Sequence, residues 1–316
     1  ADGCMICPSG LSAITTAILP FVSQGDHILM ADVVSGPARN FATKFLPRYG
    51  VSTTFFDPNI GAGIAELIRD NTKVIYLESP GSLTFEIQDT PAIAEAAKKR
   101  GCIVMTDKTR ATGLYYKPFE LGCDVSVHAA TKYIVGHSDA MLGAITCTKE
   151  AFGPIREAWD LLGVAAAPDD VYLGTRGVRT MAVRLAQHHK NGLEVAEWLE
   201  SRPEVARVLH PALPSNPYHE IWKRDFSGAS GLFAFVMQPA SEEQLAAYFD
   251  GLELFGMGSS WGGYESLMTP NDPSDYRTAT NWQAEGPLIR LHVGLENPAD
   301  LIADIEAGFR RIKALG

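Results

Sequence analysis

The chain has 316 residues, which is enough to bury a large core and to form two domains. Hydrophobic residues make up 46% of it and charged residues 20%, a composition typical of soluble globular proteins. The formal net charge of −10 argues against non-specific binding to nucleic acid or to an anionic membrane, and no apolar run reaches the roughly 18–20 residues that span a bilayer.

Short β-branched runs alternate with helical patterns through the first half of the chain. The expected strands are 27–32, 51–56, 73–78, 102–107, 124–129 and 142–147. The expected helices are 9–19, 36–46, 61–70 and 90–101, the last with Gly101 as its C-cap. Apolar strands separated by helices predict an α/β fold with a mainly parallel sheet covered on both faces.

The pattern changes near Tyr172, where a helical periodicity continues for roughly thirty residues. We expect this long helix to lead from a first domain into a second. The remaining strand-like and helical segments predict a smaller α+β unit; they are 231–238, 242–252, 288–294 and 298–315. We therefore assign residues 1–190 to a large domain and residues 191–316 to a small C-terminal domain.

The five cysteines are an odd, low number for this length, which indicates a reducing compartment and predicts a cytoplasmic protein. Cys4 and Cys7 form a CxxC pair, a spacing found in redox and metal sites. No second CxxC and no His-x-x-x-His pattern follows to complete such a site. We therefore expect both cysteines in the core and no bound metal.

Lys132 lies just after the strand 124–129, in the stretch HAATKYIVGHSDAM. Chemistry in parallel α/β sheets gathers at this carboxyl edge. Small and apolar neighbours predict a buried amine, and burial lowers the pKa of a lysine and makes it a better nucleophile. Lys132 is therefore either a covalent catalyst, with the hydroxyl of Thr131 beside it for a phosphate, or an ion-pair partner of Asp139.

Asp107 ends the strand 102–107 at the same edge of the predicted sheet. A carboxylate there needs a partner, and a protonated heterocyclic nitrogen would serve. The alternative is a loop carboxylate paired with Lys108 or Arg110.

Two further features are ambiguous when taken alone. Ser9, Gly10 and Leu11 begin a predicted helix, where free amides and the helix dipole favour a phosphate, although Ser-Gly is also a common N-cap. Arg290 lies in an apolar strand, where its guanidinium either binds a substrate carboxylate or forms a structural ion pair.

Together these features supply a phosphate site, an acid for a ring nitrogen, an amine for an aldehyde and a guanidinium for a carboxylate. That set indicates pyridoxal 5'-phosphate holding an amino acid. From about Gly3 to Arg311 the chain also resembles the cysteine and methionine metabolism group of pyridoxal-phosphate enzymes of fold type I, especially bacterial cystathionine β-lyases. The motifs that carry the resemblance include PSGLSAITTA, LESPGSLTFEIQDTPAIA, AATKYIVGHSDAMLG, SSWGGYESL and PLIRLHVGLENPADLIADIEAGF.

The resemblance implies a role for each matching residue. Lys132 matches the Schiff-base lysine, and Asp107 matches the partner of the pyridinium nitrogen. The other matches are Gly10, Leu11 and Thr131 at the phosphate, Ser35 and Ser82 beside the cofactor, Arg290 at the substrate carboxylate, and Ser260 beside the substrate.

The implied reaction is a β-elimination that releases a thiol, pyruvate and ammonia from an amino acid. Ser82 stands where γ-acting relatives usually have Asn, which argues mildly against γ chemistry. The alternatives are a γ-acting or secondary-metabolism enzyme of the same family, and a homologue that keeps the fold without catalysis.

Four positions depart from the family pattern around the expected pocket. Ser35 replaces a tyrosine that usually stacks on the cofactor, Ser259 replaces another tyrosine, and Lys108 and Arg110 replace Asn and an aromatic residue. We expect a wider and more cationic pocket that suits a bulkier or more acidic substrate. The alternative is a weakened lyase.

Family members are mostly tetramers built from dimers with shared active sites, so the resemblance implies a homo-oligomer. They also carry a further N-terminal segment, in which a Tyr-x-Arg sequence reaches the phosphate of the neighbouring subunit. Because ADGCMICPSG begins inside a family motif, we expect that segment to precede Ala1. The alternative is a phosphate site that is built differently.

Overall fold

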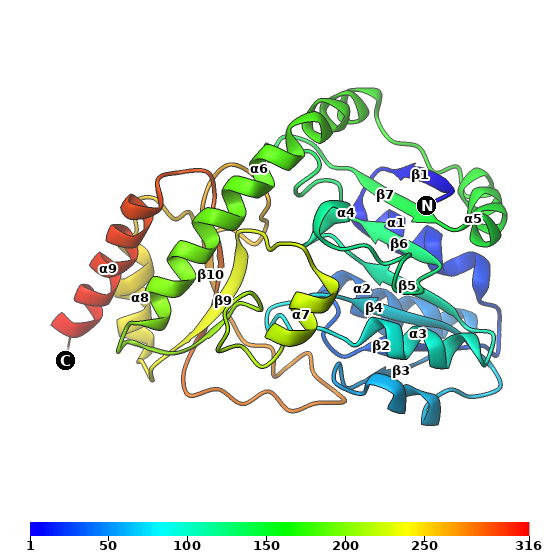
Figure 1. Ribbon diagram of the computed structural model, residues 1–316, viewed down its shortest axis with the longest axis horizontal. Helices are drawn as coiled ribbons and strands as arrows, with labels where there is room; N and C mark the ends of the chain where they lie inside the picture. Colours follow the sequence, from blue (N-terminus) through cyan, green and yellow to red (C-terminus); the bar gives the residue numbers. More distant parts are fainter. Residues whose placement is uncertain (316) are drawn as a thin grey trace.

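The structure, a computed structural model, describes residues 1–315 and contains two β-sheets with helices packed around each (Figure 1). The larger sheet has the strand order β1-β7-β6-β5-β4-β2-β3. Its strands are β1 (Gly3–Cys7), β2 (His27–Ala31), β3 (Ser52–Phe56), β4 (Thr72–Glu78), β5 (Ile103–Asp107), β6 (Val125–His128) and β7 (Gly143–Cys147).

Five neighbouring strands of this sheet, β3, β2, β4, β5 and β6, run parallel, while β7 lies antiparallel between β6 and β1. The predicted α/β class and the mainly parallel seven-stranded sheet are therefore confirmed. Each of the six predicted strands lies within one residue of its expected bounds. The remaining strand, β1, has no counterpart among the predicted strands.

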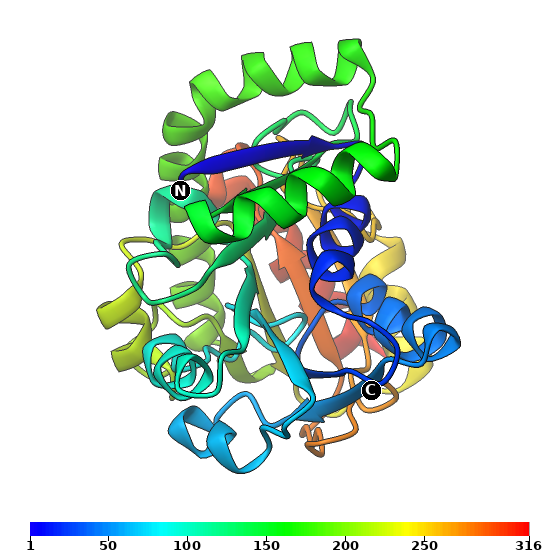
Figure 2. The same cartoon turned by 90° about the vertical axis from the view of Figure 1, so that its right-hand side faces the viewer.

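Helices cover both faces of the large sheet, and in Figure 2 α1 and α2 lie to its right and α3 to its left. The helices of this region are α1 (Gly10–Ile18), α2 (Gly36–Asn40), α3 (Thr90–Lys98), α4 (Thr112–Tyr115) and α5 (Lys149–Leu161). Two predicted helices differ from expectation. The helix expected over 36–46 changes to a π turn at Phe41, and only a 3-10 turn forms in 61–70, where Gly61 has a φ of 50°.

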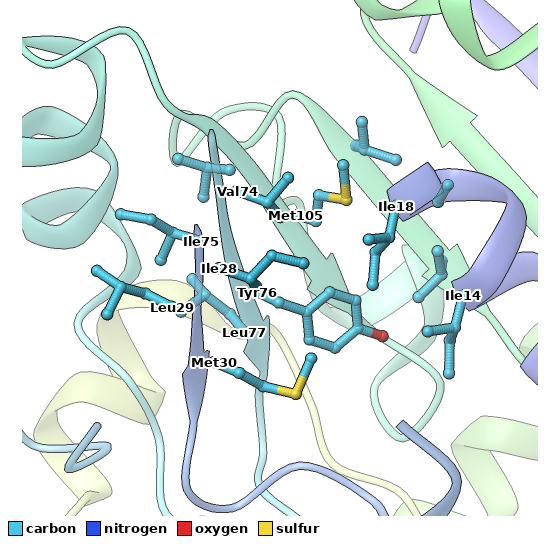
Figure 3. Packing of buried hydrophobic residues seen from close by; sticks show 14 of the residues in the cluster. Ile14, Ile18, Ile28, Leu29, Met30, Val74, Ile75, Tyr76, Leu77 and Met105 are labelled. Atoms are coloured by element: carbon cyan, nitrogen blue, oxygen red, sulfur yellow. The ribbon is translucent and has the colours of Figure 1, made fainter. Parts of the chain in front are cut away.

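The core between α1 and the sheet fixes the N-terminus of that helix. Tyr76 of β4 is fully buried and points toward Ile14 and Ile18 of α1 (Figure 3). Burial of one such apolar side chain stabilises a fold by about 1.5–3 kcal/mol. The packing therefore holds the start of α1 at the carboxyl edge of the parallel strands.

The long predicted helix is α6 (Pro168–Glu200), which runs from the large sheet to the small one (Figure 1). The small sheet is antiparallel, with the order β10-β11-β9-β8. Its elements are β8 (Val205–Leu209), α7 (His219–Asp225), β9 (Leu232–Met237), α8 (Glu242–Asp250), β10 (Leu267–Asn271), β11 (Leu288–His292) and α9 (Pro298–Ala314). Among residues 1–315, no helix is both long enough and apolar enough to cross a membrane.

Two separate apolar clusters form the main cores, one within residues 5–155 and one within residues 195–309. The domain boundary that we predict at residue 190 falls inside α6, between these clusters. One prediction about the core is wrong. Cys7 is buried but Cys4 is exposed, because residues three apart on a strand point to opposite faces.

Candidate active site

The N-terminus of α1 presents free amides beside the segment that leads to Lys132. Ser9 caps the helix by accepting a hydrogen bond from the Ser12 amide at 3.1 Å, while the amides of Gly10 and Leu11 precede the helix's own hydrogen-bond ladder. A Cβ on Gly10 would lie 2.5 Å from the Cβ of Ala129, so only glycine allows this approach. The helix end therefore suits an anion.

Asp107 ends β5 and is buried. Its Oδ1 accepts hydrogen bonds from the Thr109 amide at 2.8 Å and the Thr109 hydroxyl at 2.5 Å. The Thr109 hydroxyl in turn accepts from the Ala129 amide at 2.8 Å. Within residues 1–315, the hydrogen bonds to the Asp107 side chain thus come from Thr109, and neither Lys108 nor Arg110 donates to this carboxylate.

Burial raises the pKa of Asp107, the charge of Glu78 raises it further, and the Thr109 hydrogen bonds oppose this rise. A buried carboxyl of this kind is stabilised as the anion by a cation placed against its second oxygen. Asp107 therefore fits a protonated ring nitrogen.

Lys132 lies just after β6, and its Nζ donates a hydrogen bond to the Ser260 hydroxyl at 2.6 Å. Nζ also lies 5.1 Å from the centroid of the Trp261 ring. Asp139 is exposed and is not the partner of this amine, so the ion-pair alternative is wrong. Burial, followed by the charges of Arg290 and Arg110, lowers the pKa of Lys132 to about 8, which favours the free, nucleophilic amine.

Gly262 allows the loop that carries Ser260 to approach Lys132. Its φ is +87°, and a Cβ there would lie 3.0 Å from the backbone of Lys132. The Thr131 hydroxyl donates to the Leu142 carbonyl at 3.1 Å and accepts from the Leu142 amide at 2.9 Å, and its contact with a phosphate stays a prediction. The proton of that hydroxyl is thus already bound to the backbone next to β7.

Arg290 projects from β11, and its Nη2 donates to the carbonyls of Gly258 at 3.2 Å and Ser259 at 2.9 Å. Its Nε is buried and has no partner within the described residues. Burial and the charge of Arg110 lower the pKa of Arg290 to about 10. The hydrogen bonds of this guanidinium go to backbone carbonyls and not to a carboxylate, which leaves its positive charge available to a ligand carboxylate.

Two of the departures from the family pattern are connected through Glu78, which ends β4 beside Asp107. The Glu78 carboxylate accepts from the Ser35 amide at 2.8 Å and forms a buried ion pair with Arg110. Arg110 also donates to the Pro80 carbonyl at 3.2 Å. Because Glu78 balances the charge of Arg110, replacement of an aromatic residue by Arg110 adds less positive charge to the pocket than expected.

Glu78 and Thr109 were missed by the sequence reasoning. Glu78 carries the same signal as Asp107, a carboxylate at the end of a buried strand.

Three other predicted residues, Lys108, Ser82 and Ser259, make their hydrogen bonds with groups other than Lys132. Lys108 points to the opposite face of the sheet from Asp107, where its Nζ lies 3.4 Å from the Thr146 hydroxyl, so its expected place in the pocket is wrong. The Ser82 amide donates to the Val33 carbonyl at 2.7 Å, which places Ser82 beside the loop of Ser35. Ser259 is exposed and contributes its carbonyl to Arg290.

The arrangement combines an anion site, a carboxyl that fits a ring nitrogen, a nucleophilic amine and a guanidinium without a carboxylate partner among residues 1–315. A family model described as Cys/Met metabolism PLP-dependent enzyme matches residues 1–310. The chain is 49% identical to the cystathionine β-lyase of Escherichia coli, over 98% of this chain and 80% of that protein. It is 46% identical to the cystathionine β-lyase of Salmonella typhimurium, with the same two coverages.

A third relative carries a different name. The chain is 42% identical to an L-alanine/L-glutamate racemase of Wolbachia pipientis, over 98% of this chain and 77% of that protein. The family model and the site agree with each other: the chain belongs to the Cys/Met metabolism family of PLP-dependent enzymes, whose cofactor is pyridoxal 5'-phosphate.

Proposed function

We propose that the protein is a carbon–sulfur β-lyase of the cystathionine β-lyase type, acting on a small-molecule amino acid. The observation that carries this proposal is the contact between Lys132 and Ser260, whose loop also binds Arg290. That contact brings a nucleophilic amine and a carboxylate-binding guanidinium to one place. The relatives named cystathionine β-lyase, at 46% and 49% identity, support the reaction type.

When bound, pyridoxal phosphate supplies an electron sink that acidifies the Cα proton of an amino acid. The amides of Gly10 and Leu11 would bind the phosphate, and the Asp107 carboxylate would hold the proton on the ring nitrogen. Ser35 lies in the loop after β2, where its amide donates to the Glu78 carboxylate, and Ser82 lies in the loop after β4, where its amide donates to the Val33 carbonyl.

Arg290 binds the substrate carboxylate, and Ser260 orients the Nζ of Lys132. Nζ then accepts the Cα proton, and a thiolate leaves from Cβ with the electrons of the carbon–sulfur bond. Hydrolysis of the remaining fragment gives pyruvate and ammonia.

The test is pyruvate and thiol production from L-cystathionine by the purified yellow protein. Lys132→Ala should lose the colour and at least about a thousandfold in activity, because it removes both nucleophile and base. A Lys132→Ala protein that stays yellow and active would refute the assignment. Formation of 2-oxobutyrate in place of pyruvate would instead identify a γ-acting enzyme.

The identity of the substrate needs a second comparison, because Ser35, Arg110 and Ser259 replace aromatic residues of the family pattern. We infer a substrate that differs from cystathionine in bulk or acidity. The test compares kcat/KM for cystathionine with values for bulkier and for acidic amino acids. Ordinary β-lyase rates on cystathionine would exclude changed specificity.

A second candidate function is amino-acid racemisation, which the 42% identity to an L-alanine/L-glutamate racemase favours. Both reactions begin with transfer of the Cα proton to Lys132, and they diverge when a group does or does not leave from Cβ. Chiral chromatography after incubation with L-alanine and L-glutamate distinguishes them. Racemisation with a higher kcat/KM than elimination would make it the principal activity.

We also infer a homo-oligomer in the cytoplasm. Exposed apolar side chains support the first inference: Leu11, Phe45 and Leu162 line a hollow of about 750 Å³ beside the start of α1. The odd, low cysteine count supports the second.

A further inference from the structure

The loop over 272–287 joins β10 to β11 and reaches from the small sheet to the large one, along the bottom of Figure 1 in orange. At its tip, the amides of Thr278, Ala279 and Thr280 all donate to the carboxylate of Asp32, at 2.9–3.2 Å. Asp32 is 2% exposed and directly follows β2. A buried carboxylate thus holds three consecutive amides that lie 246–248 residues away.

A second anchor lies next to the first. Arg277 forms an ion pair with Glu86 at 2.9 Å, and the two side chains are 6% and 11% exposed. Arg277 also donates to the Thr84 hydroxyl. Thr84 and Glu86 belong to the loop after β4, next to the loop after β2 that carries Asp32. The loop after β2 also carries Ser35, and the loop after β4 also carries Ser82.

The base of the loop is connected directly to the active site. β10 and β11 form an antiparallel pair in which Thr269 lies opposite Arg290. The anchored tip and Arg290 therefore belong to one hairpin. A shift of the tip relative to the large sheet would move Arg290 relative to Lys132, because Lys132 follows a strand of the large sheet.

We propose that Asp32 and Arg277 are positioning residues, which fix the β10–β11 hairpin so that Arg290 meets the carboxylate of the substrate beside Lys132. This inference rests on the proposed amino-acid substrate. Asp32 and Arg277 themselves touch neither substrate nor cofactor.

The geometry favours this role over plain stabilisation of the loop. The loop has a separate attachment to its own sheet, where Arg207 of β8 pairs with Glu285 at 3.2 Å and donates to the Gln283 carbonyl at 2.7 Å. The contacts of Asp32 and Arg277 are different, because they cross to the sheet that carries Lys132. Arg207 of β8 therefore offers a control, because it attaches the same loop to its own sheet only.

The test measures the affinity of the holoenzyme for L-alanine and for ethylamine, which differ only in the carboxylate, through the change in absorbance of the bound cofactor. Arg277→Met and Asp32→Asn should each raise the Kd for L-alanine by about tenfold, the scale of one charged hydrogen bond. Both should leave the Kd for ethylamine within about twofold. Arg207→Met should change neither value.

Two further measurements separate positioning from folding. In an Arg290→Met background, Arg277→Met should no longer affect L-alanine binding, because its effect passes through Arg290. Hydrogen exchange of the amides of residues 278–280 should accelerate in Asp32→Asn, which shows that the tip was released.

Equal losses for both ligands, additive effects with Arg290→Met, or unchanged exchange at the tip would each overturn the proposal. Binding of L-alanine needs no leaving group, so these measurements do not depend on lyase activity. A protein that fails to cleave cystathionine but passes them would contradict the proposed reaction and retain the positioning role.

Discussion

Burial and the charges of Arg290 and Arg110 together lower the pKa of Lys132 from 10.5 to about 8. Since the neutral amine is the nucleophile, its reaction with pyridoxal phosphate in the apoprotein should accelerate about tenfold per pH unit and level off above about pH 8. Stopped-flow absorbance measures this rate. Arg290→Met should raise the midpoint, because the charge of Arg290 lowers the pKa of Lys132 more than the charge of Arg110 does.

A different pH dependence would contradict the lowered pKa of Lys132. An amine with ordinary titration would show no plateau until about pH 10.

Burial destabilises the charged form of Asp107 when no cation is bound next to its carboxylate. Because its pKa is raised above 3.8, the folded apoprotein binds a proton that the unfolded chain has released, so stability falls as pH rises above about 4. Asp107→Asn should therefore stabilise the apoprotein at about pH 8 by about 1–3 kcal/mol and weaken cofactor binding. Denaturant unfolding of the apoprotein, repeated at about pH 4, measures the effect.

The stability gained by Asp107→Asn should vanish at low pH, where Asp107 carries its proton in both the folded and the unfolded parent protein. A variant less stable than the parent at about pH 8 would show that the carboxylate contributes favourably without the cofactor.

Residues with a local signal could be predicted, and residues defined by distant partners could not. Lys132 and Asp107 each follow a buried strand, so the pattern of the chain places them at the carboxyl edge of the sheet. Asp32 follows a buried strand too and pairs with Arg39, seven residues on. Its partners in the loop over 272–287, however, are 246–248 residues away and are joined to it only by the fold. The role of Arg110 likewise depended on Glu78, 32 residues before it.

Binding of an anion at the N-terminus of α1 should depend on the close packing of Gly10 against the segment that leads to Lys132. In Gly10→Ala, the added methyl would lie 2.5 Å from the Cβ of Ala129, which must push the start of the helix outward. Overpacking of this kind costs about 1–3 kcal/mol, so the Kd for pyridoxal phosphate should rise by about tenfold or more. Fluorescence titration of the apoprotein measures the Kd.

Gly153→Ala provides the matched control, because Gly153 lies inside α5 with open space around its Cβ position. It should leave cofactor affinity unchanged. Equal cofactor affinity in the two variants would contradict the dependence on close packing.

Elements with a strong periodicity could be predicted, and elements with interrupted patterns could not. The parallel strands are continuous apolar runs, and α6 keeps its period over 33 residues. In contrast, α5 contains Pro154, and β10 contains Pro270 and is only partly buried. Gly61 favoured a turn over the helix that the apolar spacing of 61–70 predicted.

The whole molecule places its chemistry between two sheets that are built independently. The large sheet supplies Asp107 and Lys132, and the small sheet supplies Arg290. α6 joins the two parts on one side, and the anchored loop over 272–287 joins them on the other. Substrate recognition therefore depends on contacts that neither sheet makes alone.

The family resemblance implies a homo-oligomer, and we expect a second copy of the chain to cover the hollow beside α1. Phe45 and Leu162 are 39% and 55% exposed, and they line this hollow. Light scattering should give the parent protein a mass of at least two chains. The double variant Phe45→Glu, Leu162→Glu should give the mass of one chain, because burying two unpaired carboxylates costs several kcal/mol.

Leu254→Glu provides the control, since Leu254 is 43% exposed but does not line the hollow. It should keep the mass of the parent protein. Leu11 lies at the same hollow and at the start of α1, so loss of the partner should also weaken the binding of pyridoxal phosphate. A parent protein with the mass of one chain, or a double variant that still associates, would exclude this face as the interface between copies.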